Sequence, residues 1–139
     1  KKELLKIPVF GWVTRATCVV VYRASQESRK KSLNYLKKIS GLGINVLIFP
    51  EGTQNRTQEI MQPFKEGAFR IAVDTGQSIQ PLAVVGAGAL MPPGTLRIKP
   101  GVIKIIVGDV IPVEPGVDQV QRLKDHTFGV LQQLIQKNS

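Results

Sequence analysis

A short acidic motif, Phe49-Pro50-Glu51-Gly52-Thr53, is the clearest candidate for chemistry in this sequence. It follows the apolar run 46–49, which predicts a buried strand, and Pro50 cannot extend a hydrogen-bonded ladder. Gly52 permits a backbone angle that other residues avoid. Glu51 is therefore expected at a strand tip, where its carboxylate accepts a hydrogen bond from a hydroxyl group or pairs with a cation. An ordinary strand-to-loop turn with a solvated glutamate fits the same pattern.

Two cations accompany this motif. Lys65 precedes Gly67 in the segment 64–69, where we expect a helix to begin, and backbone amides at a helix N-terminus attract phosphate. Arg23 follows the apolar run 19–22, and its planar guanidinium suits phosphate oxygens. Taken singly, each segment also has a purely structural explanation. The first fits a helix entry packed by two phenylalanines, and the second fits an exposed cation at a strand end.

Alternating strands and helices must position these residues. Apolar runs predict strands at 19–22, 46–49, 79–85 and 102–107. Helical spacing predicts a helix from Ser25 or Ser28 to Ser40 that stops at Gly41, a second from Gly67 to Thr75 that stops at Gly76, and a third capped by Asp118 with Val120, Leu123, Val130, Leu131 and Leu134 on its apolar face. The order predicts an α/β fold, with a mixed, partly parallel sheet covered by helices on both faces. Because sites in such sheets form where strands end, Arg23 and Glu51 are expected to line one crevice.

The composition is that of one ordinary globular domain, with 139 residues, 42% of them hydrophobic and 21% charged. The net charge of +9 is concentrated, since residues 1–70 hold 13 Lys/Arg against 5 Asp/Glu, and residues 71–139 hold 6 against 5. Such a surface favours phosphate, anionic lipid headgroups or nucleic acid, or simply keeps the protein soluble. No aromatic residues are interleaved with the basic stretches, so we expect no nucleic-acid partner. One histidine and one cysteine cannot build a metal site, so we expect none.

Five segments in order resemble the PlsC-type glycerolipid acyltransferases, which include the 1-acyl-glycerol-3-phosphate acyltransferases. The segments are Lys1–Leu4 with Ile7–Gly11, Val19–Arg23, Phe49–Thr53, Phe64–Phe69 and Ile79–Leu82. The resemblance is clear over residues 1–85 and weak beyond them, apart from the region 102–113. It implies a glycerol-3-phosphate acyltransferase-like core. It also implies transfer of a fatty acyl group from acyl-CoA or acyl carrier protein to the hydroxyl of a lysophosphatidate-like glycerol phosphate in phospholipid biosynthesis, with no further cofactor.

The resemblance also implies roles for single residues. Glu51, Gly52, Thr53 and Arg23 would hold the acceptor and its phosphate, with Lys65 and Gly67 at the helix start, and Lys1 or Lys2 would join them. The family usually has arginine after Glu-Gly-Thr. This sequence has Gln54 at that position, and we expect Arg56 to substitute for the missing arginine.

The base expected of the family is missing. Its members use a histidine as general base and an aspartate five residues later, a motif that lies shortly before the Lys-Lys-Glu-Leu segment. Here the one histidine, His126, falls within the last predicted helix and is followed by Leu131, so we assign no catalytic residue. We therefore expect residues 1–139 to be a single, N-terminally incomplete acyltransferase domain that is nearly inactive alone. The alternative is a noncatalytic lipid-phosphate or membrane-surface binding module on the same fold.

An amphiphilic acceptor implies contact with a membrane. The expected partners are a glycerophospholipid acceptor, an acyl donor and an anionic membrane surface, which the basic helix segment 29–38 would meet unless it is simply a solvated helix face. No apolar run approaches the ~20 residues of a spanning helix. We expect the protein at the cytoplasmic face of a membrane, held there peripherally or by a segment outside this chain.

Overall fold

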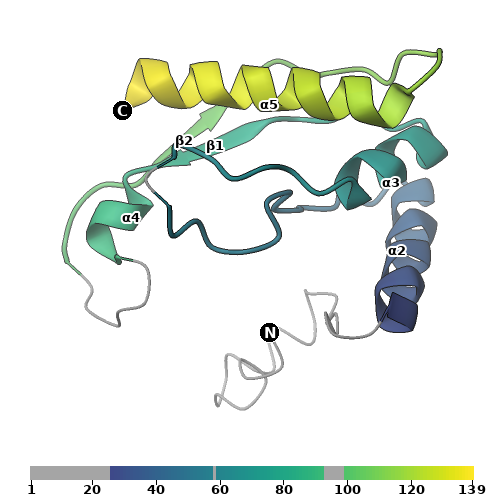
Figure 1. Ribbon diagram of the computed structural model, residues 1–139, viewed down its shortest axis with the longest axis horizontal. Helices are drawn as coiled ribbons and strands as arrows, with labels where there is room; N and C mark the ends of the chain where they lie inside the picture. Colours follow the sequence, from purple (N-terminus) through teal and green to yellow (C-terminus); the bar gives the residue numbers. More distant parts are fainter. Residues whose placement is uncertain (1–25, 58, 93–98) are drawn as a thin grey trace. The chain divides into compact units, whose positions relative to one another are not determined.

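The computed structural model describes residues 26–57, 59–92 and 99–139 (Figure 1). The chain divides into two compact units, Lys1–Val46 and Leu47–Ser139. The first contains α2 (Gln26–Gly41), and the second contains α3 (Gly67–Thr75), β1 (Leu82–Val85), α4 (Ala87–Leu90), β2 (Lys104–Val107) and α5 (Gln119–Asn138). The predicted strand at 19–22 lies outside the described residues, and the single domain stays a prediction.

Helix α2 forms where the sequence predicted it, but the chain reverses later than expected. Gly41 is the last helical residue and not the stop. The left-handed residue is Gly43, with φ of 79°, a conformation that costs glycine little. Its N–H donates to the carbonyl of Ser40 at 2.9 Å, and the N–H of Ile44 donates to the carbonyl of Ile39 at 3.3 Å. These two bonds form a Schellman motif, which satisfies carbonyls that the end of a helix leaves open.

The core of the second unit forms where α3 and α5 meet β1. Phe69 of α3 is 1% exposed, and its ring centroid lies 6.1 Å from that of Phe64. The rings of Phe64 and Phe128 of α5 pack edge to face, with their centroids 4.9 Å apart. The buried apolar cluster consists of Met61, Phe64, Phe69, Ala72, Ala83, Ile111, Leu123 and Leu131. The apolar face predicted for the last helix is confirmed, since all five of its residues belong to this cluster or pack against it.

The ends of α3 and α5 illustrate one success and one failure of the capping rules. Gly76 ends α3 as predicted, with φ of 66° and its N–H shared between the carbonyls of Ala72 and Val73. Asp118 precedes α5, but its side chain makes no capping hydrogen bond, so that prediction is wrong. Its φ of 53° is left-handed, whereas a capping side chain is directed at the helix by a β-region backbone.

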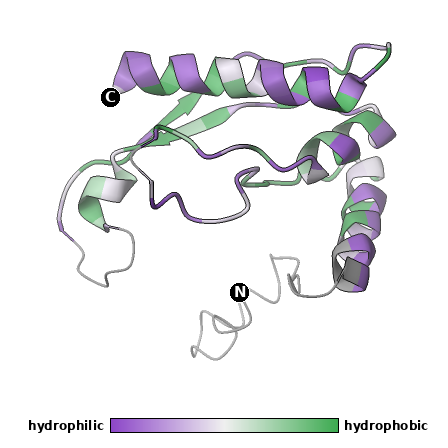
Figure 2. Cartoon of the chain, viewed as in Figure 1, coloured by the Kyte–Doolittle hydropathy of each residue, from purple (hydrophilic) through white to green (hydrophobic). Residues whose placement is uncertain are grey.

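Strands β1 and β2 form an antiparallel pair, with Leu82 opposite Val107 and Val85 opposite Lys104. Both strands are strongly apolar and lie beneath α5 (Figures 1 and 2). Alternation turns Ala83 toward the core, while the other face carries exposed Leu82, Val84, Ile105 and Val107. The α/β class is confirmed. The strand pairs formed within the described residues are antiparallel, so the expected parallel pairing is not found among them.

Proline shortens the predicted strand 79–85. Pro81 accepts a bond from the N–H of Gly108 at 3.0 Å but has no N–H to return. Pairing resumes at Ile79, which exchanges hydrogen bonds of 2.9 and 2.8 Å with Ile111. Compared with the register of β1 and β2, this bridge leaves one extra residue after β2, which is a β-bulge. Because strand faces alternate, the extra residue brings Ile111 into the core.

The buried strand predicted at 46–49 is wrong. These residues form no strand, and Leu47 and Phe49 are 70% and 72% exposed. A short apolar run predicts burial, but a strand also needs a neighbouring chain to satisfy its backbone groups. Within the part of the chain that the structure describes, no segment pairs with this run.

The difference between Phe69 and Phe49 can be tested by stability measurements. Phe69→Ala is expected to lower the free energy of unfolding by about 3–5 kcal/mol, because it empties a filled site in the core. The matched variant Phe49→Ala removes an exposed ring and is expected to cost less than about 1 kcal/mol. Urea titration followed by circular dichroism measures both. Equal losses would contradict the exposed position of Phe49.

Candidate functional site

Six of the seven predicted site residues lie in the second unit, within the segment 51–67. They are Glu51, Gly52, Thr53, Arg56, Lys65 and Gly67. The seventh, Arg23, lies outside the described residues, as do Lys1 and Lys2. A crevice shared by Arg23 and Glu51 therefore stays a prediction.

The segment from Pro50 to Lys65 is a loop closed on itself by hydrogen bonds. The backbone N–H of Lys65 donates to the carbonyl of Pro50 at 2.8 Å. The backbone N–H of Gln62 donates to Oε2 of Glu51 at 2.9 Å, and the hydroxyl of Thr53 donates to Oε1 of Gln62 at 3.0 Å. These bonds hold the Glu-Gly-Thr motif beside the Phe-Lys-Glu-Gly motif, as the predicted site requires.

Gly52 forms the turn at which the two motifs meet. Its φ of 74° is left-handed, and a turn bond from its N–H to the carbonyl of Phe49 measures 3.1 Å. A Cβ at this position would stand 3.5 Å from Cγ of Lys65, so the lysine stem lies against the glycine. A side chain here fits in space but strains the backbone. Glu51, Gly52 and Lys65 therefore form one compact surface.

The far end of the loop is organised by Asn55. Its carboxamide oxygen accepts bonds from the N–H and hydroxyl of Thr57, at 2.9 and 2.7 Å, and its nitrogen donates to the carbonyl of Glu59 at 2.8 Å. Arg56 is exposed at this tip. Among the described residues, no hydrogen bond or ion pair joins Arg56 to Glu51 or Lys65. The substitution of Arg56 for the family arginine therefore has no support from these contacts.

Charges at the start of α3 leave Lys65 as the available cation. Arg70 donates two hydrogen bonds to Oε2 of Glu66, at 2.8 and 3.1 Å. The Arg70 hydrogen bonds, and then its positive charge, hold the pKa of Glu66 below its ordinary value. Glu66 stays ionised and occupies Arg70. Within the described residues, Lys65 has no ion pair, and it precedes α3 by two residues in the chain.

Gln62 is the site residue that the sequence did not reveal. It bonds to Glu51 through its backbone and to Thr53 through its side chain, across 11 and 9 positions. No periodicity or motif signals a contact at that separation. Only the closure of the loop brings the three residues together.

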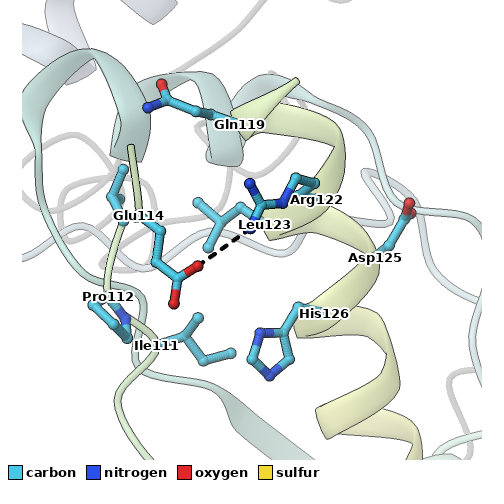
Figure 3. Close-up of a pocket in the computed structure, with 9 residues that line it drawn as sticks. Ile111, Pro112, Glu114, Gln119, Arg122, Leu123, Asp125 and His126 are labelled. Carbon is cyan, nitrogen blue, oxygen red and sulfur yellow. Dashed lines mark hydrogen bonds and ion pairs between the residues drawn. The ribbon is translucent and has the colours of Figure 1, made fainter. Parts of the chain in front are cut away.

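A pocket of about 380 Å³ lies elsewhere in the second unit, between the segment 111–114 and the first turns of α5 (Figure 3). Glu114 and Arg122 pair across it at 3.3 Å, and His126 lines it from the helix. Leu131, five residues after His126, is buried in the core, so no carboxylate follows this histidine at the expected spacing. None of the predicted site residues lines this pocket.

Comparisons with known proteins match the segment that contains the two motifs. The family model described as Acyltransferase matches residues 1–85. The chain is 34% identical over 116 residues to a 1-acyl-sn-glycerol-3-phosphate acyltransferase of Chlamydomonas reinhardtii, covering 82% of this chain and 35% of that protein. It is 30% identical over 141 residues to one of Salmonella typhimurium, covering 97% and 55%.

A solved structure shares the fold. The 1-acyl-sn-glycerophosphate acyltransferase PlsC of Thermotoga maritima superposes with a TM-score of 0.81 at 24% identity, covering 97% of this chain and 53% of that one. The chain thus spans between a third and about half of the proteins it matches. The likeness confirms the α/β fold expected from the sequence.

The family match covers more than half of the chain and includes both halves of the loop, from Glu51 to Gly67. Since the same segments are those that the structure brings together, fold, motifs and family agree: the chain belongs to the acyltransferase family.

Proposed function

We propose that this protein takes part in transferring a fatty acyl group to the hydroxyl of a lysophosphatidate-like glycerol phosphate, in phospholipid biosynthesis. The family supports acyl transfer, and the relatives named above support the acceptor class. Either acyl-CoA or acyl carrier protein serves as the donor. Comparing the two donors in one assay of the whole protein decides between them.

The observation that carries the proposal is the closed loop from Pro50 to Lys65. Its hydrogen bonds hold the Glu51 carboxylate and the Thr53 hydroxyl in the same closed loop as Lys65, whose backbone lies two residues before α3. A glycerol phosphate needs acceptors for its hydroxyl groups and cations or amides for its phosphate. Both kinds of group are present here.

The cationic and anionic groups of the loop would bind different parts of the acceptor. Lys65 and the N-terminal amides of α3 would bind the phosphate, because cations and helix N-termini both attract anions. Glu51, held by the Gln62 amide, would accept a hydrogen bond from the glycerol. Thr53 would support it from the adjoining position. Arg23 would add a second cation. Gly52 supplies the turn between Glu51 and Thr53.

Proton removal from the acceptor hydroxyl is not assigned to any residue of this chain. His126 lies in α5, in a wall of a different pocket, with Leu131 at the position where the family expects an acid. The alternative function is a noncatalytic module that binds lipid phosphate with the same loop.

Acceptor binding tests the loop directly. Glu51→Ala is expected to weaken lysophosphatidate binding by about tenfold or more, since hydrogen bonds to charged groups contribute about 1.5–3 kcal/mol. Isothermal titration calorimetry below the micelle-forming concentration measures the affinity. Glu59→Ala is the matched control, because it removes the same charge from the same loop, and binding should change less than about twofold. Equal effects of the two variants would remove Glu51 from the site.

A turnover assay tests the expectation that residues 1–139 hold no general base. With acyl-CoA and lysophosphatidate, the 139-residue chain is expected to be slower by about 10²–10⁴-fold than a family member that has its histidine base. A thiol-release assay measures this rate, and His126→Ala should leave any residual rate unchanged. Rapid turnover that His126→Ala abolishes would show that His126 is the base. Binding without turnover, even in a longer form of the protein, would favour the noncatalytic alternative.

A further inference from the structure

The net charge of the protein is confined almost entirely to the first unit. Residues 1–46 hold 10 Lys/Arg against 2 Asp/Glu, whereas residues 47–139 hold 9 against 8. Helix α2 alone contains five cations and one acid. An excess of this size over 46 residues creates a local positive field, while the second unit is close to neutral.

The exposed residues of α2 lie on one face. Lys30, Asn34 and Lys38 are spaced four residues apart, and Lys31 and Tyr35 form the adjacent row. Residues at these spacings are neighbours on a helix surface. Leu33, Leu36 and Ile39 are half-buried and lie on the opposite side of the helix. The exposed face thus carries three lysines, with Glu27 as its one acid.

These lysines are free to meet an external anion. Lys31 pairs with Glu27 at 2.6 Å, but both side chains are about three quarters exposed, and exposed pairs one turn apart are weak. Lys30 and Lys38 have no ion-pair partner in the described part of the first unit. The lysine face, defined by Lys30, Lys31 and Lys38, therefore presents more positive charge than its one acid can balance.

Apolar groups lie beside the lysine face. Tyr35 is 54% exposed within it, and Leu42, one turn beyond Lys38, is 70% exposed. Ile44 is also exposed just after the Schellman turn. A tyrosine combines an apolar ring with a polar hydroxyl, a combination that suits the boundary between lipid and water.

We propose that the lysine face of α2 docks on the surface of a bilayer that contains anionic lipid, with Tyr35 and Leu42 entering the headgroup layer. Lipid phosphates and carboxylates supply the charge that complements the three lysines. Duplex nucleic acid would meet the same charge, but it offers nothing to Leu42 and Ile44. No helix in the described part of the chain is long and apolar enough to cross a membrane, so the proposal concerns surface contact.

Vesicle sedimentation tests the proposal without requiring turnover. The 139-residue chain is mixed with vesicles of phosphatidylcholine alone or with about 30% phosphatidylglycerol. Binding is expected only to the anionic vesicles. It should weaken when NaCl is raised from about 0.05 M to about 0.5 M, because salt screens exposed charges. Binding to neutral vesicles with equal affinity would overturn the proposal.

Two charge-matched triple variants locate the contact. Lys30→Gln/Lys31→Gln/Lys38→Gln is expected to weaken binding about a hundredfold, from about fivefold for each well-placed lysine. Lys99→Gln/Lys124→Gln/Lys137→Gln removes the same charge from the second unit and should change affinity by less than about threefold. Circular dichroism checks that each variant retains its helix content. Equal losses would show that the attraction is spread over the whole molecule, and the proposal would fail.

Two further measurements test the role of Tyr35 and Leu42 and the alternative that the lysine face binds duplex nucleic acid. Tyr35→Ser/Leu42→Ser should reduce the binding that survives at high salt, while leaving the salt-sensitive part unchanged. If that variant binds like the parent chain, nothing enters the headgroup layer. If the chain ignores the anionic vesicles but binds duplex DNA, and loses that binding in the lysine-face variant, the surface recognises nucleic acid and the membrane proposal is wrong.

Discussion

The packing of three aromatic rings supports the rest of the second unit. Phe64 stacks on Phe69 of α3 and meets the edge of Phe128 of α5, so one side chain just before α3 joins both helices. Large rings contribute much of the apolar area that a small core can bury. The position of Phe64 also fixes Lys65, the next residue, and with it one end of the candidate site. Core packing and site geometry therefore depend on the same contact.

Backbone amides and side chains both hold the candidate site together. Pro50 accepts from the amide of Lys65, and the Glu51 carboxylate accepts from the amide of Gln62. The side chains of Thr53 and Asn55 make further bonds within the loop. The Glu66–Arg70 pair adds to this arrangement. It pairs the acid nearest the start of α3 with a cation of the same helix, while Lys65 has no ion pair within the described residues.

Features governed by local rules were predictable from the sequence. The bounds of α3, its glycine stop and the apolar face of α5 follow from periodicity and chain conformation within one or two turns. Features that depend on a distant partner were not. The apolar run 46–49 predicts a strand, but a strand requires a neighbouring segment to which its backbone can hydrogen-bond. Pro81 interrupts the strand because it accepts a hydrogen bond from Gly108 but has no N–H to donate in return. Gln62 contacts Glu51 only because the loop closes.

The bulge after β2 decides which residue of that segment is buried. In an unbroken ladder Val110 would pair with Ile79 and face the core, and Ile111 would point outward. The observed pairing reverses them, so Ile111 is buried and Val110 is exposed. Gly108 lies against Leu134 of α5, where a Cβ would stand 2.8 Å from the end of the leucine side chain. Losing one residue between 107 and 111 would remove the bulge and leave Ile111 still opposite Ile79 in a regular ladder, and replacing the exposed Val110 would hardly disturb the fold.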